Sequence, residues 1–345
     1  MNSFSGRAAA TCLVLLFTCA VCAPGARAVS ESDGGELQTL VPVGHTVGVK
    51  LFADGVLVVG LSEGDTPAKA SGLREGDVML AFSGTEIDST EHLKRLLAEN
   101  GGAATTMSVR RGARTLTLPV TPEATAGGTC RLGAWIRDSM AGIGTMTFYD
   151  PQSGVFGALG HGVTDVDVGR LMPLESGSIM DATVKAVKRG ESGSPGELRG
   201  DFDLTRDSGS LYANTDCGLF GTVEGRTNAV TTQKPMPIAK RGEVTVGEAT
   251  ILANCGGDEV REYDVVIERV YALANPTRNL LLHVTDPELL AQTGGIVQGM
   301  SGAPIVQNGR LAGAVTHVLV NDPTRGYGIF IGNMLDAAGL TAAAD

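Results

Sequence analysis

The sequence predicts a mainly β protein with two domains, and three observations lead to this prediction. The chain has 345 residues, which is enough for two ordinary domains, each with a core of its own. Glycine is abundant, with 48 residues, and aromatic residues make up only 4% of the chain, which favours turn-rich β structure over a helical bundle. Short apolar runs separated by turn residues recur along most of the sequence, as expected for strands.

The charge and the cysteine content exclude several classes of protein. The formal net charge is -11, whereas a nucleic-acid-binding protein needs a basic face that neutralises phosphates. Beyond the N-terminal segment the chain keeps only Cys130, Cys217 and Cys255, without C-x-x-C spacing, which excludes a zinc ribbon and a dense disulfide framework. One Cys217–Cys255 disulfide and three free, buried thiols remain as alternatives. We expect no metal ion, no cofactor and no nucleic-acid partner.

The first 28 residues have the pattern of an export signal. Arg7 precedes an apolar run at 8–23, which ends at Pro24-Gly25. Ala26-Arg27-Ala28 has the small-x-small form that a signal peptidase accepts. The run is also close to the length of a short transmembrane helix, so an uncleaved membrane anchor is the alternative. We therefore expect a protein exported across a membrane, with this segment as its only membrane contact.

A first domain is expected at 39–121, after a flexible, polar leader at 29–38. Its most specific feature is the turn sequence Gly-Leu-Arg-Glu-Gly-Asp at 72–77, in which glycine permits a tight turn and aspartate caps it. The other expected elements are strands at 47–51, 55–59 and 78–82, a helix at 91–97, and strands at 105–110 and 115–120.

This turn sequence and this order of elements resemble a PDZ domain of the type attached to exported bacterial proteases. The resemblance implies a small α+β domain with a groove between a strand and a helix, where an extended peptide, often a C-terminus, is added as a strand. The peptide-binding strand is expected at Gly55, Val56, Leu57 and Val58, with Val47–Leu51 as the alternative.

A second, mainly β domain is expected at 130–345, after a linker of small residues at 122–129. Apolar alternation recurs there in short segments, with turn signals about a dozen residues apart, which is typical of a β-sandwich or β-barrel. One helix is expected late in the chain, at 333–338.

Ser301 lies in the sequence Gly-Met-Ser-Gly-Ala-Pro at 299–304, which has the pattern of an activated nucleophile. Such a serine needs a tight turn that exposes its oxygen and aligns backbone N–H groups toward a developing oxyanion. The flanking glycines permit this turn, and the N–H groups of Gly299 and Ser301 are the expected donors. The alternative is a plain Gly-Ser turn between two strands.

A catalytic serine requires a base, and His161 is the best candidate among the five histidines of the chain. His92 lies on a charged helix, and His45 precedes the first strand of the PDZ-like domain. His283 and His317 alternate with apolar residues, as ordinary strand residues do. His161 follows a strand and lies between two glycines, where a side chain can project from a close-packed turn. A buried structural histidine is the alternative for this position.

With these two residues the sequence resembles the stage IV sporulation protein B peptidases. This chymotrypsin-related family joins an N-terminal membrane segment, a PDZ domain and a serine peptidase domain. The resemblance implies a chymotrypsin-like β-barrel peptidase in the second domain. The matching stretches are Arg137-Asp138-Ser139, Ala141-Gly142-Ile143-Gly144-Thr145, Gly157-Ala158-Leu159-Gly160-His161-Gly162 and Thr293-Gly294-Gly295-Ile296-Val297-Gln298-Gly299-Met300-Ser301-Gly302.

The resemblance implies Asp286 as the acid of a triad, because the family uses an acid shortly before its serine. The acid would accept the N–H of His161, fix its tautomer and stabilise the imidazolium. Asp286 precedes Pro-Glu, however, and is also a good helix N-cap. The wider clan has its acid roughly midway between base and nucleophile, and position alone suggests Asp201, Asp203 or Asp216.

The resemblance also implies an exported regulatory serine endopeptidase of sporulation. Such proteins act in the space between forespore and mother cell. There they cleave themselves and a regulatory subunit of a membrane-embedded protease, so that a late sigma factor is released. The PDZ domain is implied in self-recognition and substrate targeting. Two alternatives remain: an exported peptide-binding scaffold with an inactive protease-like domain, and a housekeeping quality-control protease.

Overall fold

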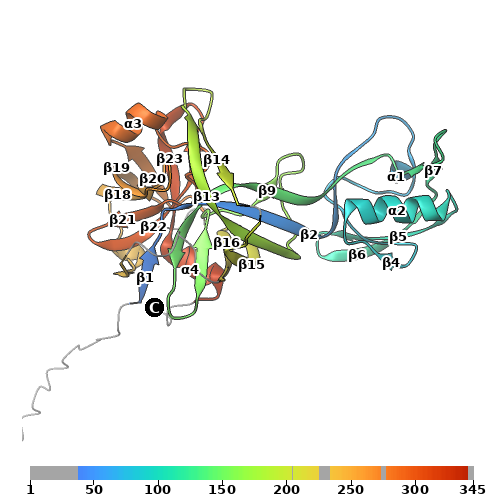
Figure 1. The fold of residues 1–345 in the computed structure, drawn as a ribbon, viewed down its shortest axis with the longest axis horizontal. Coiled ribbons are helices and arrows are strands. Elements are labelled where there is room, and N and C mark those ends of the chain that lie inside the picture. The colour runs from blue at the N-terminus through green and yellow to red at the C-terminus, as the bar shows by residue number, and fades with distance from the viewer. Residues whose placement is uncertain (1–37, 204, 225–233, 273–276, 341–345) are drawn as a thin grey trace, which may run out of the picture. The chain divides into compact units, whose positions relative to one another are not determined.

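The computed structural model describes residues 38–203, 205–224, 234–272 and 277–340. The predicted export segment at 1–28 and nearly all of the predicted leader lie outside these ranges. Within them, no helix is long and apolar enough to cross a membrane. Strands make up most of the described chain, as the sequence predicts (Figure 1).

Six strands form the first barrel, because each is hydrogen-bonded to two neighbours in a ring that closes on itself. The order around the ring is β2, β9, β10, β16, β15, β13 and back to β2. Leu51, Met146, Phe156 and Leu219 belong to its core. The strands are β2 (Thr46–Leu61), β9 (Ala134–Tyr149), β10 (Val155–Ala158), β13 (Ser176–Lys188), β15 (Gly209–Thr215) and β16 (Gly218–Val223).

The second barrel is also closed and has the corresponding order of six strands, β18, β19, β20, β23, β22 and β21. Ile251, Ile267, Leu282 and Val315 belong to its core. The strands are β18 (Gly247–Ala253), β19 (Arg261–Val270), β20 (Leu280–Val284), β21 (Pro304–Gln307), β22 (Arg310–Leu319) and β23 (Asp322–Phe330).

The PDZ part, residues 53–138, is inserted between two neighbouring strands of the first barrel. Residues 46–52 of β2 pair with 139–145 of β9 in the barrel, whereas 57–61 pair with 134–137 in the PDZ part (Figure 1). Residues 47–51, which the sequence analysis assigns to the PDZ domain, therefore lie in the barrel. The other elements of the PDZ part are α1 (Pro67–Ala70), β3 (Val78–Phe82), β4 (Thr85–Glu86), α2 (Thr90–Asn100), β5 (Thr105–Arg111), β6 (Arg114–Val120), β7 (Glu123–Ala124) and β8 (Cys130–Arg131).

The predicted helix of the PDZ part is confirmed as α2, and its ends follow from local chemistry. The Ser89 hydroxyl accepts a hydrogen bond from the His92 N–H at the first turn, and Gly101 ends the helix with φ 62. Leu93 and Leu97 point from α2 into the PDZ core. The PDZ part therefore has a hydrophobic core separate from those of the two barrels.

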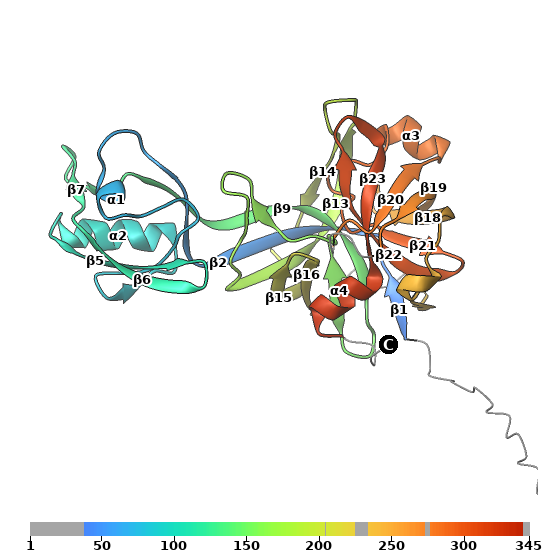
Figure 2. The ribbon, with the colours of Figure 1, turned by 180° about the vertical axis from the view of Figure 1, so that it is seen from behind.

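Short elements complete the fold. The late helix is confirmed as α4 (Ile331–Ala338), which lies against β16 (Figure 2). A further helix, α3 (Pro287–Thr293), follows β20. The remaining elements are β1 (Thr39–Pro42), β11 (Thr164–Asp165), β12 (Arg170–Leu171), β14 (Glu197–Phe202), β17 (Met236–Pro237) and the 3-10 turn η2 (Arg241–Glu243).

Candidate active site

Ser301 lies in the tight turn between α3 and β21. The glycines on either side have φ 99 at Gly299 and φ 97 at Gly302, a region that favours glycine. A Cβ atom at Gly302 would lie 2.0 Å from the carbonyl oxygen of Thr145, so the turn packs too closely against the first barrel for a larger residue. The Ser301 hydroxyl donates a hydrogen bond of 2.8 Å to the carbonyl of Thr316.

The same turn presents two backbone N–H groups that are free to bind an oxyanion. Met300 N–H donates to Val297, and Gly302 N–H donates to Val315. Among the described residues, the N–H groups of Gly299 and Ser301 have no acceptor. These are the two donors that the sequence predicts, and an oxyanion hole requires such unpaired donors.

His161 lies in the turn that follows β10. The turn is tight: Leu159 has φ 69, and a Cβ atom at Gly162 would lie 2.1 Å from Leu171 Cδ2. The His161 Nδ1 atom is 2.9 Å from the carbonyl oxygen of Gly162. Burial lowers the pKa of the His161 imidazole, because it disfavours the charged form of the ring.

One cavity of about 810 Å³ contains His161 and Ser301. Its other lining residues include Gly299, Asp216 and His317. Among the described residues no hydrogen bond joins His161 to Ser301, because each side chain faces a backbone carbonyl instead. Hydrogen bonds of this kind often form only when substrate is bound. The cavity thus brings together the predicted nucleophile, the predicted base and the two predicted oxyanion donors.

Asp286 does not line this cavity. It is the N-cap of α3, and its carboxylate accepts the N–H of Leu289 at 2.8 Å and the N–H of Asp264 at 3.4 Å. The structure therefore confirms the alternative role of Asp286 as a helix cap, and it does not bring this carboxylate to His161.

Asp216 is the acidic residue among those that line the cavity. It lies in the turn between β15 and β16, where its side chain is exposed. Among the described residues its carboxylate has no hydrogen-bond partner or ion pair. The other two positional candidates, Asp201 and Asp203, line a different cavity together with His45. Of the four candidate acids, Asp216 is thus the one that shares a cavity with the base.

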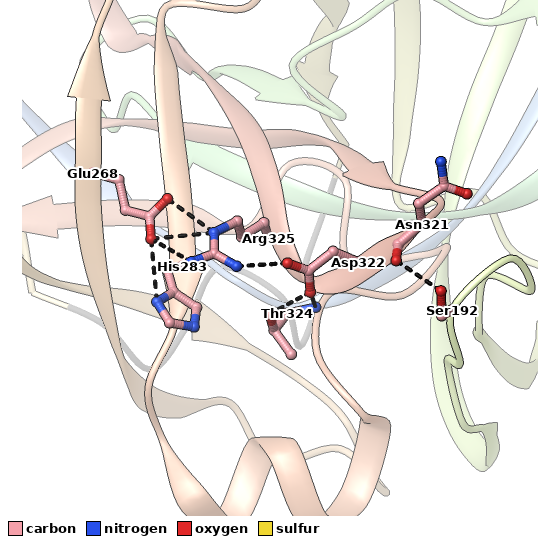
Figure 3. Close-up of polar contacts among 7 residues, drawn as sticks. All are labelled: Ser192, Glu268, His283, Asn321, Asp322, Thr324 and Arg325. Carbon is pink, nitrogen blue, oxygen red and sulfur yellow. Dashed lines mark hydrogen bonds and ion pairs between the residues drawn. The ribbon is translucent and has the colours of Figure 1, made fainter.

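The remaining histidines differ in their surroundings. Figure 3 shows His283 in an ion-pair network, where its Nδ1 lies 3.3 Å from Glu268. Arg325 binds the same carboxylate and lowers the pKa of Glu268. His45 is buried, with its Nδ1 2.8 Å from the carbonyl of Thr46. Neither His283 nor His45 lines the cavity of Ser301.

His317 is a residue of the site that the sequence analysis treats as an ordinary strand residue. It lies on β22, lines the cavity, and has its ring centroid 5.0 Å from that of His161. Burial, followed by the charges of His161 and Arg278, lowers the pKa of His317 to about 4. No sequence signal distinguishes it from the other histidines on strands.

The predicted peptide-binding strand of the PDZ part lies between two neighbouring strands from Val56 on. Val56 and Leu57 pair with β3, while Leu57 and Val58 pair with β9. The alternative strand, Val47–Leu51, is likewise paired with β13 and β9. Since a peptide is added only to a free edge, both predicted positions are wrong.

A free edge is found instead on the first residues of β9. Residues 134–138 pair only with β2 within the described part of the chain. This end of β9 lies near α2, because the N–H of Thr90 donates a 2.7 Å hydrogen bond to Asp138. Leu132 is buried in the same core as Leu93 of α2. The edge of β9 therefore has the strand-and-helix setting that a PDZ groove requires.

All three cysteines in the described ranges are free thiols. Cys255 is buried, whereas Cys130 and Cys217 are partly exposed. The expected alternative of a Cys217–Cys255 disulfide is therefore wrong. The other alternative, three free and buried thiols, is confirmed for the free state of all three cysteines but for burial only at Cys255.

The fold and the site together define a serine peptidase with a PDZ domain. The SpoIVB peptidase S55 family model matches residues 128–335, and a PDZ domain model matches residues 59–111. The first match covers more than half of the chain, and the chain belongs to this peptidase family. A search of curated proteins found no match.

Several solved structures resemble parts of the chain at low sequence identity. The Rv3671c protease from M. tuberculosis, in its active form, is 17% identical over 60% of this chain and 78% of that chain, with a TM-score of 0.32. The thermostable serine protease AL20 from an extremophilic microorganism is 13% identical over 58% of this chain and 92% of that chain, with a TM-score of 0.33. The PDZ domain of the SdrC-like protein Lmo2051 from Listeria monocytogenes is 21% identical over 24% of this chain and 87% of that chain, with a TM-score of 0.22.

Proposed function

We propose that this serine peptidase is an exported regulatory endopeptidase of sporulation signalling. Its substrates are the chain itself and a regulatory subunit of a membrane-embedded protease that processes a sigma factor. The observation that carries the chemistry is the shared cavity of His161 and Ser301, with the free N–H groups of Gly299 and Ser301 beside it. Membership of the SpoIVB peptidase S55 family supports the biological role.

Peptide cleavage proceeds in two steps at this cavity. Ser301 Oγ attacks the peptide carbonyl while His161 takes its proton, and His161 then returns the proton to the leaving amine. The oxyanion binds the N–H groups of Gly299 and Ser301, and water releases the acyl-enzyme. Before the attack, the Ser301 hydroxyl leaves the carbonyl of Thr316 and turns to His161.

Asp216 is the acid that orients His161 in this mechanism. It lines the same cavity and its carboxylate is uncommitted among the described residues, which supports this role over that of Asp286. A carboxylate in this role accepts the second N–H of the imidazole and stabilises the imidazolium. The ring of His161 must then turn its Nδ1 away from the Gly162 carbonyl.

The PDZ part recruits substrate by adding an extended peptide to the free edge of β9. The N–H groups of Leu132 and Gly133 have no acceptor among the described residues, and Gly133 has φ 77. Successive N–H groups in such a turn form a nest for an anion, which suits a C-terminal carboxylate. This arrangement supports a role in targeting the enzyme to its own chain and to its substrate.

The proposed chemistry is tested with the purified chain alone. We expect self-cleavage on incubation and covalent labelling by a serine-directed fluorophosphonate, and we expect Ser301→Ala to abolish both. If Ser301→Ala changes neither result, the proposed role of Ser301 is wrong. A wild-type chain that is neither cleaved nor labelled would indicate the inactive peptide-binding scaffold.

The proposed biology needs separate measurements. A regulatory endopeptidase degrades unfolded casein slowly or not at all, whereas a housekeeping protease degrades it rapidly. Deletion of the gene is expected to block sporulation, and only the wild-type gene, not Ser301→Ala, is expected to restore it. Normal sporulation of the deletion strain would refute the sporulation role without affecting the chemistry.

A further inference from the structure

Thr145 on β9 connects the turns of both catalytic residues. It is 1% exposed. Its N–H donates a 2.9 Å hydrogen bond to the carbonyl of Ser301, and its hydroxyl donates a 2.7 Å hydrogen bond to the carbonyl of Gly299. Its own carbonyl accepts the N–H of Leu159, two residues before His161, at 3.1 Å. One residue of the first barrel thus binds the nucleophile turn twice and the base turn once.

The hydroxyl of Thr145 acts on the oxyanion hole through Gly299. With φ 99 and no side chain, Gly299 has little of its own to fix the rotation of its peptide groups. The peptide group before it is held by the Leu198 N–H, which donates to the carbonyl of Gln298 at 2.8 Å. The peptide group after it is held at its carbonyl by the Thr145 hydroxyl and at its N–H by the carbonyl of Val297. The first of these groups carries the Gly299 N–H, and the second connects it to the peptide group that carries the Ser301 N–H.

Thr147 shows that a buried threonine on β9 does not need such a bond. It lies two residues further along the strand, at an irregularity in the pairing of β9 with β10. Thr147 is fully buried, and its hydroxyl has no hydrogen-bond partner among the described residues. A buried threonine hydroxyl on this strand therefore does not always form a hydrogen bond, and the bond from Thr145 to Gly299 is specific to that position.

We propose that Thr145 is a positioning residue of the peptidase, whose hydroxyl holds the peptide group between Gly299 and Met300 so that the N–H donors on either side of it, those of Gly299 and Ser301, both point at the oxyanion. The proposal rests on the proposed catalytic roles of Ser301 and Gly299. A misdirected donor stabilises the transition state less, while the contacts of the bound substrate are unchanged. Loss of the hydroxyl therefore lowers kcat and leaves KM nearly unchanged.

The test compares Thr145→Val with the wild-type chain on a peptide substrate. Valine has the shape of threonine and keeps the backbone bond to Ser301, but it lacks the hydroxyl. We expect kcat to fall about 10- to 100-fold, with KM within about threefold of the wild-type value. Thr145→Ser retains the hydroxyl and is expected to keep kcat within about threefold of wild type.

Thr147→Val is the matched control, because it removes an unpaired hydroxyl from the same strand. It is expected to keep the wild-type kcat, KM and unfolding midpoint. Should Thr145→Val fail to fold, Thr145→Ser and Thr145→Ala carry the test, since both lose the methyl group and differ in the hydroxyl.

Equal kcat values for Thr145→Ser and Thr145→Ala, or a Thr145→Val enzyme within about threefold of wild type, overturn the positioning role. A wild-type chain that neither cleaves peptide nor reacts with fluorophosphonate overturns the peptidase roles themselves. The two failures are distinguishable, because in the second case every variant is inactive.

Discussion

The two barrels have corresponding strand orders, but they contribute differently to the cavity between them. The first barrel contributes His161, the proposed base, and the exposed carboxylate of Asp216. The second barrel contributes Ser301, the proposed nucleophile, and the proposed oxyanion donors. The acid that the family resemblance implies in this barrel, Asp286, caps a helix instead.

This difference shows that commitment to a local partner decides which polar residues are available for catalysis. Asp286 is bound by the N–H of Leu289, and His283 is paired with Glu268. Asp216, in contrast, has no such partner among the described residues. A buried or capping carboxylate that left its partner would leave an N–H unsatisfied, which costs about 1–3 kcal/mol. The uncommitted group at the cavity is the one that can turn to His161 freely.

The largest effect is expected from Ser301→Ala and His161→Ala, which remove one contribution of each barrel. Each replacement is expected to lower kcat by about 10⁴-fold or more, and the double variant should lose little beyond either single one, because the two residues act as a unit. Single-turnover cleavage of a peptide substrate measures this loss. Additive losses would mean that the two barrels contribute separate steps.

The next largest effect distinguishes the two carboxylates. Asp216→Ala is expected to lower kcat/KM about 100-fold, because His161 loses the partner that orients it. Asp286→Ala is expected to keep kcat/KM within about threefold of wild type but to destabilise the fold by about 1 kcal/mol, the usual cost of losing an N-cap. Activity assays and urea unfolding of both variants test the assignment, and the reverse pattern would return the catalytic role to Asp286.

The sequence predicts the catalytic turns well because their signals are local. Gly299 and Gly302 have the positive φ values that the motif around Ser301 implies, and the cap of α3 is encoded by an Asp before Pro-Glu. The family resemblance and the local cap signal disagreed about Asp286, and the structure agrees with the cap. A helix cap can be predicted from a few consecutive residues, whereas the set of residues that line a cavity cannot, because they come from distant parts of the sequence.

The insertion of the PDZ part could not be predicted for a related reason. Residues 47–51 and 55–59 have the same alternating pattern. Residues 47–51 nevertheless form hydrogen bonds with barrel strands, whereas 55–59 belong to the sheet of the PDZ part. Their partners on β9 are more than seventy residues away in the sequence. Apolar alternation specifies a strand and its buried face, but it does not specify the partner strand or which edge stays free.

A smaller effect, on stability, is expected from His317, which lies on the second barrel close to the base of the first. Because its folded pKa is lowered to about 4, the unfolded chain binds more protons between pH 4 and pH 6.5. Its contribution to stability is fully present above pH 6.5 and is lost as the pH falls toward 4. We expect the free energy of unfolding to fall from pH 7 to pH 5 because of this residue, by less than the full pKa shift implies, since the ring is partly exposed and solvent screens its charge.

Urea unfolding at both pH values measures this difference, with His317→Gln as the informative variant. Glutamine does not titrate, so the pH dependence of this variant should be smaller than that of the wild-type chain. His283→Gln is the matched control, because His283 lies on the same barrel outside the cavity. An unchanged pH dependence in His317→Gln would show that His317 is not buried as a neutral ring.

The smallest effect is expected at the PDZ end of β9, and it separates the free edge from the paired strand. A hexapeptide that ends in Val with a free carboxylate should slow hydrogen exchange at residues 134–138, whose outer edge is open. Amides at 55–58 should change little, because both edges of that strand are already paired. The same peptide with an amidated C-terminus should bind about tenfold more weakly, because the nest at Leu132 and Gly133 loses its anion. Slower hydrogen exchange only at residues 55–58 would indicate that the peptide binds the strand that the sequence predicts. Equal affinity for the two peptides would exclude a carboxylate site at Leu132 and Gly133.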